Sequence, residues 1–124
     1  MIDEFTVKEI IEFHRNLFLN FKDYKNNFGI DLLMNKKVSK LSMGEKQKVG
    51  IYLALSSDSD ILLLDEPLAG VDTNTKKTIV TEIKKISKNK LVILASHQSF
   101  NYGSAKVLSI IDGEIEENIL DIKI

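Results

Sequence analysis

An α/β fold in which helices precede a parallel sheet is predicted by three features of the 124-residue sequence. Apolar residues recur at helical spacing over 7–21, and a second, apolar helix is expected over 43–55. Two continuous aliphatic runs, 61–64 and 91–95, then enclose a third helical pattern over 73–88. Strand, helix and strand in this order form a βαβ unit, which predicts a parallel sheet in the second half.

Capping residues delimit the expected helices of the first half. Thr6 and Glu9 have the spacing of a capping box and open the first helix, which we expect to reach Phe21. A shorter helix is expected over 23–28 and should end at Gly29, because glycine accepts the left-handed conformation that often follows a last helical turn.

The second half is expected to be built mainly from strands. The run 61–64 is apolar throughout, which is typical of a strand buried on both faces, and 91–95 is expected to be a second buried strand. Asp112 and Gly113 form the strongest short turn signal of the chain. They predict a C-terminal β-hairpin over 106–120.

Charge and composition exclude several classes of protein. The formal net charge is −1, and Arg15 is the single arginine among 17 basic residues, so no global basic field favours nucleic acid. The absence of cysteine excludes disulfide scaffolds, thiol catalysis and cysteine-based zinc sites. The acidic start does not fit a secretory signal, and no apolar run approaches the roughly 20 residues that span a bilayer. We therefore expect a soluble intracellular protein.

The strongest candidate for chemistry is the pair of carboxylates Asp65 and Glu66, which follows the run 61–64. Open parallel sheets place their ligands at the carboxyl ends of the strands. Mg²⁺ commonly takes one protein carboxylate together with waters and phosphate oxygens. Because side chains alternate along a strand, the two carboxylates could divide metal binding from polarising a water. A strand that merely ends in acidic turn residues explains the same pattern.

Further candidates lie at a helix start and in two loops. Ser42 and Gly44 open the second helix, where free N–H groups and a hydroxyl can bind an anion, although a capping box with Glu45 explains the same residues. His97 directly follows the second strand and could hydrogen-bond a phosphate or a water. An exposed loop histidine would explain His97 equally. Asp72, taken alone, is explained as an N-terminal residue of the third helix.

Taken together, these residues resemble the motifs of ATP-binding cassette (ABC) ATPases. Residues 41–47, with the sequence LSMGEKQ, resemble the LSGGQ signature. In the family's order, 61–67 resembles the Walker B strand with its catalytic glutamate, 68–72 the D-loop and 95–97 the H-loop. The helix over 6–21 resembles the start of the helical subdomain of bacterial export-type cassettes. The resemblance covers essentially the whole chain.

The resemblance implies a partial P-loop NTPase fold of the ABC type. Residues 1–57 would form the helical subdomain, and 58–124 the C-terminal half of a RecA-like ATPase core that ends in the hairpin. The implied function is that of the C-terminal portion of a transporter's ATP-binding subunit, which couples ATP hydrolysis to transport. Its partners would be a second ABC ATPase subunit, in a head-to-tail dimer, and a transmembrane permease subunit at the inner, cytoplasmic face of the membrane.

By the same resemblance, individual residues receive roles. Asp65 would hold Mg²⁺ through water, and Glu66 would act as general base for the hydrolytic water. His97 would contact the γ-phosphate. Ser42 and Gly44 would reach the γ-phosphate of an ATP bound mainly to the partner subunit.

Three other positions bear on that dimer interface. Asp72 would link the two sites across it. Met43 replaces the first glycine of the signature and could crowd the phosphate. Glu45 replaces the glutamine of the signature and adds a negative charge near the phosphate.

A P-loop is absent from these residues. The motif needs Gly-Lys-Ser/Thr, and none of the six glycines precedes a lysine. We therefore expect the chain alone to bind ATP weakly and to need a Walker A half for hydrolysis. In the family's sheet the Walker A strand lies between the H-loop strand and the next one, so two apolar strands here would have unpaired edges. We expect pairing with another chain or a rearranged sheet.

Two other functions are compatible with the same motifs. A truncated cassette could act as a non-catalytic module that binds partner subunits. The C-terminal lobe of an SMC-like DNA-repair ATPase head shares the signature, Walker B and D-loop, but it follows a long coiled coil. The helix over 6–21 is short and lacks sustained heptads, which disfavours that lobe.

Overall fold

The computed structural model describes residues 2–96 and 104–121. The helices are α1 (Val7–Leu17), α2 (Met43–Ser56) and α3 (Thr73–Ile86), with short 3₁₀ helices at Ile2–Glu4, Ile30–Leu33 and Val38–Lys40. The strands are β1 (Ile61–Asp65), β2 (Leu91–Ala95), β3 (Ser104–Ile111) and β4 (Glu114–Asp121). Within the described residues, none of the helices has the length and apolar composition needed to cross a membrane.

Helix α1 begins where the sequence predicts, but it ends earlier than predicted. The Thr6 hydroxyl accepts a hydrogen bond from the Glu9 N–H at 3.2 Å, so the residue caps the helix. The helix stops at Leu17 instead of reaching Phe21, because Phe18 is extended, with φ −102° and ψ 117°.

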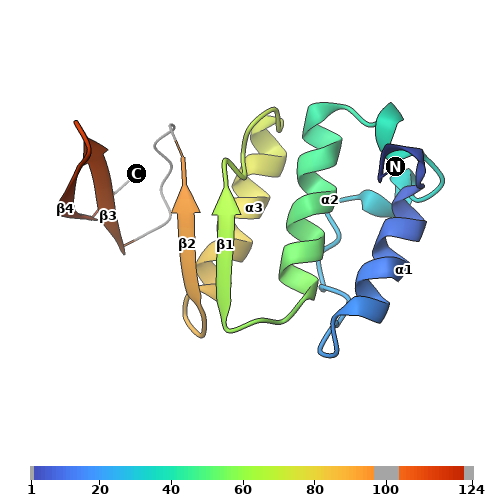
Figure 1. The fold of residues 1–124 in the computed structure, drawn as a ribbon, viewed down its shortest axis with the longest axis horizontal. Helices are drawn as coiled ribbons and strands as arrows, with labels where there is room; N and C mark the ends of the chain where they lie inside the picture. The colour runs from blue at the N-terminus through green and yellow to red at the C-terminus, as the bar shows by residue number, and fades with distance from the viewer. Residues whose placement is uncertain (1, 97–103, 122–124) are drawn as a thin grey trace.

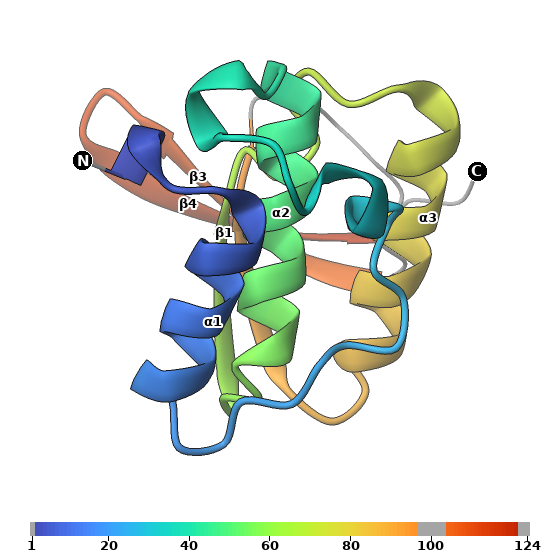
Figure 2. The same cartoon turned by 90° about the vertical axis from the view of Figure 1, so that its right-hand side faces the viewer.

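The helix predicted over 23–28 is wrong, since this segment runs in an irregular path past the end of α2 toward α3 (Figure 2). Two main-chain N–H groups at the start of this stretch bond to a distant residue and not to a preceding helical turn. The Lys22 N–H donates to the Ser56 carbonyl at 2.8 Å, and the Tyr24 N–H donates to the Ser56 hydroxyl at 3.0 Å. Ser56 is fully buried, and its two contacts hold the segment against α2.

Strands β1 and β2 form the predicted βαβ unit with α3 between them. They pair in parallel, from Ile61 opposite Leu91 to Asp65 opposite Ala95. The predicted C-terminal hairpin is also present, because β3 and β4 pair antiparallel. Asp112 and Gly113 join them with positive φ of 51° and 79°, as a type I′ turn requires. In the described part of the chain the two pairs form separate two-stranded sheets.

The prediction that β1 and β2 are buried on both faces is wrong. Leu62 and Leu64 are buried against α3, whereas Leu63 on the opposite face is 70% exposed. On β2, Ile93 is 50% exposed. The reason is that helices cover the sheet on one face. In Figure 1, α3 covers one face of β1 and β2, and no other described helix covers the second face. The sheet therefore presents an apolar face of the kind that α/β proteins normally bury.

Helix α2 lies between two apolar cores and joins them. Val49 and Tyr52 belong to a core that includes residues of α1. Ile51 and Leu55 belong to a second core, which includes β1 and α3. Because α2 is held on two sides, its N-terminus has a fixed position relative to the sheet.

Candidate functional site

The carboxyl ends of β1 and β2 and the amino ends of α2 and α3 lie at one end of the molecule (Figure 1). This arrangement follows from the chain path, because α2 leads down to β1 and α3 returns from it. Every predicted site residue that the structure describes lies at this end of the molecule: Ser42, Gly44, Glu45, Asp65, Glu66 and Asp72. His97 lies outside the described residues.

Glu66 directly follows β1 and has an unusual backbone. Its φ of 46° is left-handed, a conformation that costs a residue other than glycine about 1–2 kcal/mol. Both of its main-chain groups are hydrogen-bonded to other elements. The N–H donates to the Ala95 carbonyl of β2 at 2.8 Å, and the carbonyl accepts from Nε2 of Gln47 on α2 at 2.8 Å. These bonds stabilise a conformation that the residue disfavours.

The start of α2 is a complete capping box. The Glu45 N–H donates to Oγ of Ser42 at 3.1 Å, and the Ser42 N–H donates to Oε1 of Glu45 at 2.9 Å. The bond from the Ser42 N–H, with Lys36 nearby, lowers the pKa of the Glu45 carboxyl, so the group is ionised near neutral pH. Nζ of Lys36 lies 3.5 Å from Oε2 of Glu45, so its positive charge partly offsets the negative charge of this carboxylate. The Ser42 hydroxyl accepts the Glu45 N–H within the cap, and a hydroxyl that accepts a bond can still donate its own proton.

Gly44 brings the first turn of α2 against the loop that follows β1. A Cβ atom at Gly44 would lie 2.5 Å from the Gly70 carbonyl oxygen, so glycine is required for this approach. Gly70 has a positive φ of 71°, and a Cβ there would meet side-chain atoms of Met43 at 3.0–3.3 Å. Met43 therefore lies over Gly70. The first turn of α2 and the loop after β1 therefore pack directly on each other.

Asp72 caps α3, as its position in the sequence suggests. Its carboxylate accepts from the Thr75 N–H at 2.9 Å and from the Thr75 hydroxyl at 2.6 Å. These bonds lower the pKa of Asp72. Nζ of Lys48 on α2 lies 3.9 Å from Oδ1 of Asp72, which adds a second link between α2 and this loop.

The described residues contain no group of three or more metal-ligating side chains. Asp65 ends β1 as an exposed carboxylate next to Glu66. This donor set does not suit a metal held wholly by protein. It fits Mg²⁺, which accepts a single carboxylate when phosphate oxygens and waters complete its shell.

The contacts that Gln47, Lys36 and Lys48 make at this end were not predicted from the sequence. Gln47 and Met43 are four residues apart on α2, as are Lys48 and Gly44, so helical periodicity places all four on one side. That periodicity was the available signal. Tertiary packing decides which loop this side of α2 faces, and the sequence pattern does not show it.

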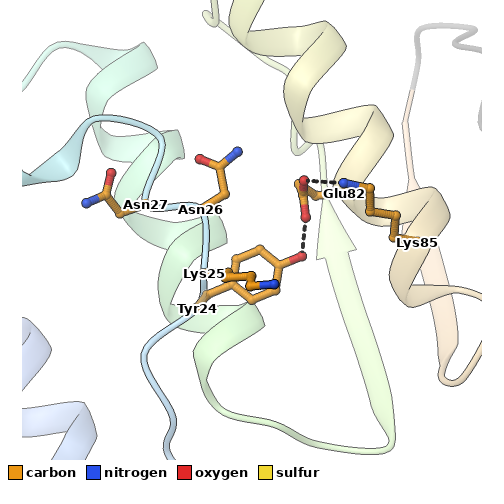
Figure 3. A pocket seen from close by; sticks show the side chains of 6 residues that line it. All are labelled: Tyr24, Lys25, Asn26, Asn27, Glu82 and Lys85. Atoms are coloured by element: carbon orange, nitrogen blue, oxygen red, sulfur yellow. Dashed lines mark hydrogen bonds and ion pairs between the residues drawn. The ribbon is translucent and has the colours of Figure 1, made fainter.

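A separate open pocket of about 560 Å³ lies between the irregular segment and α3, lined by Tyr24, Lys25, Asn26, Asn27, Glu82 and Lys85 (Figure 3). The Tyr24 hydroxyl donates to Glu82 at 2.5 Å, and Lys85 lies 3.2 Å from the same carboxylate. Burial and the bond to Glu82 raise the pKa of Tyr24. These contacts fasten the segment to α3, and none of the predicted site residues lines the pocket.

Residues 2–69 match the family model described as ABC transporter. The ATP-dependent lipid A-core flippase of Pasteurella multocida is 28% identical over 116 residues, which are 93% of this chain and 20% of the flippase. The chain spans 15–24% of the length of the curated relatives it matches.

Two solved structures share the fold. An archaeal ribosome recycling factor, solved with an archaeal ribosomal stalk protein, gives a TM-score of 0.69 at 30% identity, over 89% of this chain and 23% of its own. An ATP-binding cassette solved as a dimer in a post-hydrolysis state with ADP and Pi gives 0.65 at 29% identity, over 72% of this chain and 40% of its own. The present chain is thus mixed α/β and matches part of such a cassette.

Proposed function

Because the chain belongs to the ABC transporter family, we propose that it supplies the signature, Walker B and D-loop side of an ATP-hydrolysing cassette. A P-loop from elsewhere completes the site. One observation carries this proposal: the starts of α2 and α3 and the end of β1 meet, with Gly44 packed against Gly70 and Gln47 bonded to Glu66. The contacts join the three motifs into one unit at the edge of the sheet where ligands bind.

The roles within this unit follow from chemistry and position. Asp65 would hold Mg²⁺ through a water, and the ion supplies charge stabilisation for the phosphates when bound. The Glu66 carboxylate accepts a proton from the attacking water. His97, on the segment after β2, would contact the γ-phosphate.

The start of α2 serves a second nucleotide. Ser42 donates its hydroxyl proton, and the backbone N–H of Gly44 in the first turn of α2 would reach the γ-phosphate of an ATP bound mainly to a partner cassette. Glu45 is paired with Lys36, so its charge repels that phosphate less than an isolated carboxylate would. Asp72 is exposed and would face the partner across a head-to-tail interface. The related cassette solved as a dimer with ADP and Pi supports this assembly.

The domain division and the membrane partner belong to the same proposal. Residues 1–57 act as the helical subdomain and 58–124 as part of the RecA-like core. The apolar face of β1 and β2, exposed at Leu63 and Ile93, is covered by the remainder of the cassette. A permease subunit would hold the assembly at the cytoplasmic face of the membrane, where hydrolysis drives transport.

Complementation tests the proposal. The chain is mixed with a separate chain that carries the P-loop part of an ABC cassette, and phosphate release from Mg²⁺-ATP is measured for each chain and for the mixture. We expect the mixture to hydrolyse ATP and each chain alone to be inactive. Association without turnover would contradict the enzymatic role and favour a partner-binding module. Turnover by this chain alone would contradict the need for a P-loop.

A further inference from the structure

Gln47 makes a contact between α2 and Glu66, and no role has been assigned to this residue so far. Its Nε2 donates to the Glu66 carbonyl at 2.8 Å in a partly buried position. The Ala69 N–H donates to the same carbonyl at 3.2 Å. The carbonyl is therefore held from two directions, by a helix side chain and by the turn that follows.

The left-handed backbone of Glu66 makes this contact consequential. With φ at 46°, the Cα–Cβ bond leaves the chain in a different direction from that of a residue with negative φ, and the carboxylate follows it. A general base must lie within hydrogen-bonding reach of the proton that it removes. The hydrogen bonds that hold the N–H and the carbonyl of Glu66, on either side of its Cα, therefore fix where the carboxylate is presented.

The location of Gln47 links that direction to α2 as a whole. Met43 and Gly44, one turn earlier, pack on Gly70, and Lys48 lies near Asp72. The same side of α2 thus contacts the loop at three points beyond Glu66. A displacement of α2 relative to β1 would be transmitted to the Glu66 carbonyl through the side-chain amide of Gln47.

We propose that Gln47 is a positioning residue, whose side-chain amide holds the Glu66 carbonyl and keeps the backbone left-handed, so that the carboxylate is presented in a fixed direction. The inference rests on the proposed role of Glu66 as general base. It adds a residue of α2 to the proposed chemistry of Asp65, Glu66 and His97, and it makes the geometry of the base depend on the position of α2.

Three variants separate positioning from general stability. Gln47→Met keeps the side-chain length and removes the donor, whereas Gln47→Lys keeps a donor of similar reach. Lys77→Met places the same methionine at an exposed position of α3 and serves as the matched control. Amide hydrogen exchange is measured by NMR on the 124-residue chain, and kcat and KM for ATP are measured with the P-loop chain added.

For Gln47→Met we expect the amides of Glu66 and Ala69 to exchange about tenfold faster, as for the loss of one hydrogen bond. We expect kcat to fall about ten- to a hundredfold with KM unchanged, as for a misplaced reacting group. Gln47→Lys should restore both. If Gln47→Met behaves like Lys77→Met, or if protection falls evenly over all amides with kcat unchanged, the inference is overturned. If Gln47→Met shows faster local exchange but the wild-type chain with the P-loop chain has no turnover, the contact is upheld and the proposed function is refuted.

Discussion

Replacing Glu66 by glutamine is expected to lower ATP turnover of the completed cassette by about 10²- to 10⁴-fold, the usual contribution of a general base. Glutamine keeps the size of the side chain and removes the carboxylate that accepts a proton from water. The bonds to Ala95 and Gln47 use main-chain atoms of Glu66, so they survive the change. We therefore expect an unchanged unfolding midpoint, retained ATP binding and loss of phosphate release.

The matched control for this variant is Glu9→Gln, which removes one exposed carboxylate from α1, a helix that carries none of the site residues. Turnover of the control should equal that of the wild type. If Glu66→Gln hydrolyses ATP as fast as Glu9→Gln does, Glu66 is not the base, and the assignment of the β1 end to Walker B chemistry fails with it.

Replacing Gly44 by alanine is expected to have the largest effect on stability. The new Cβ would lie 2.5 Å from the Gly70 carbonyl oxygen, and backbone on both sides must move to relieve the overlap. Overpacking of this kind costs about 1–3 kcal/mol. Because the start of α2 and the loop after β1 would separate, we also expect turnover in the completed cassette to fall.

Gly50→Ala is the matched control, since Gly50 lies on the same helix and a Cβ there would meet nothing within 4 Å. In an open helical position, alanine is favoured over glycine by about 0.8–1 kcal/mol. Urea unfolding of both variants should give free energies that change in opposite directions. If Gly44→Ala is as stable as Gly50→Ala, the close contact between α2 and the loop does not exist in solution.

The parts of the fold that local chemistry determines were predictable from the sequence. Thr6 and Ser42 cap helices where the sequence predicts, and at Ser42 the reciprocal bond from Glu45 completes the expected capping box. The βαβ unit and the hairpin at Asp112 and Gly113 also follow from runs and turns that lie close together in the chain.

The errors arose where distant residues decide the structure. The segment 23–28 is irregular because Ser56, more than 30 residues later, accepts the Tyr24 N–H. The exposure of Leu63 could not be predicted either, because an apolar run does not tell whether one layer or two cover a strand.

The candidate site shows the same division. The positions of Ser42, Asp65 and Asp72 at element ends were predictable, because caps and strand ends are local features. The contact between Gln47 and Glu66 was not, since it depends on how α2 packs against the loop after β1.

Under the proposed function, these residues form one side of a nucleotide site and need a P-loop for the other. The first experiment is a calorimetric titration of the 124-residue chain with Mg²⁺-ATP, with oligomeric state recorded by light scattering in the same buffer. We predict weak or undetectable binding by the chain alone, and tight binding once a P-loop chain is added. Micromolar binding by a monomer of this chain alone would contradict the claim, because it would require a phosphate site built without a P-loop.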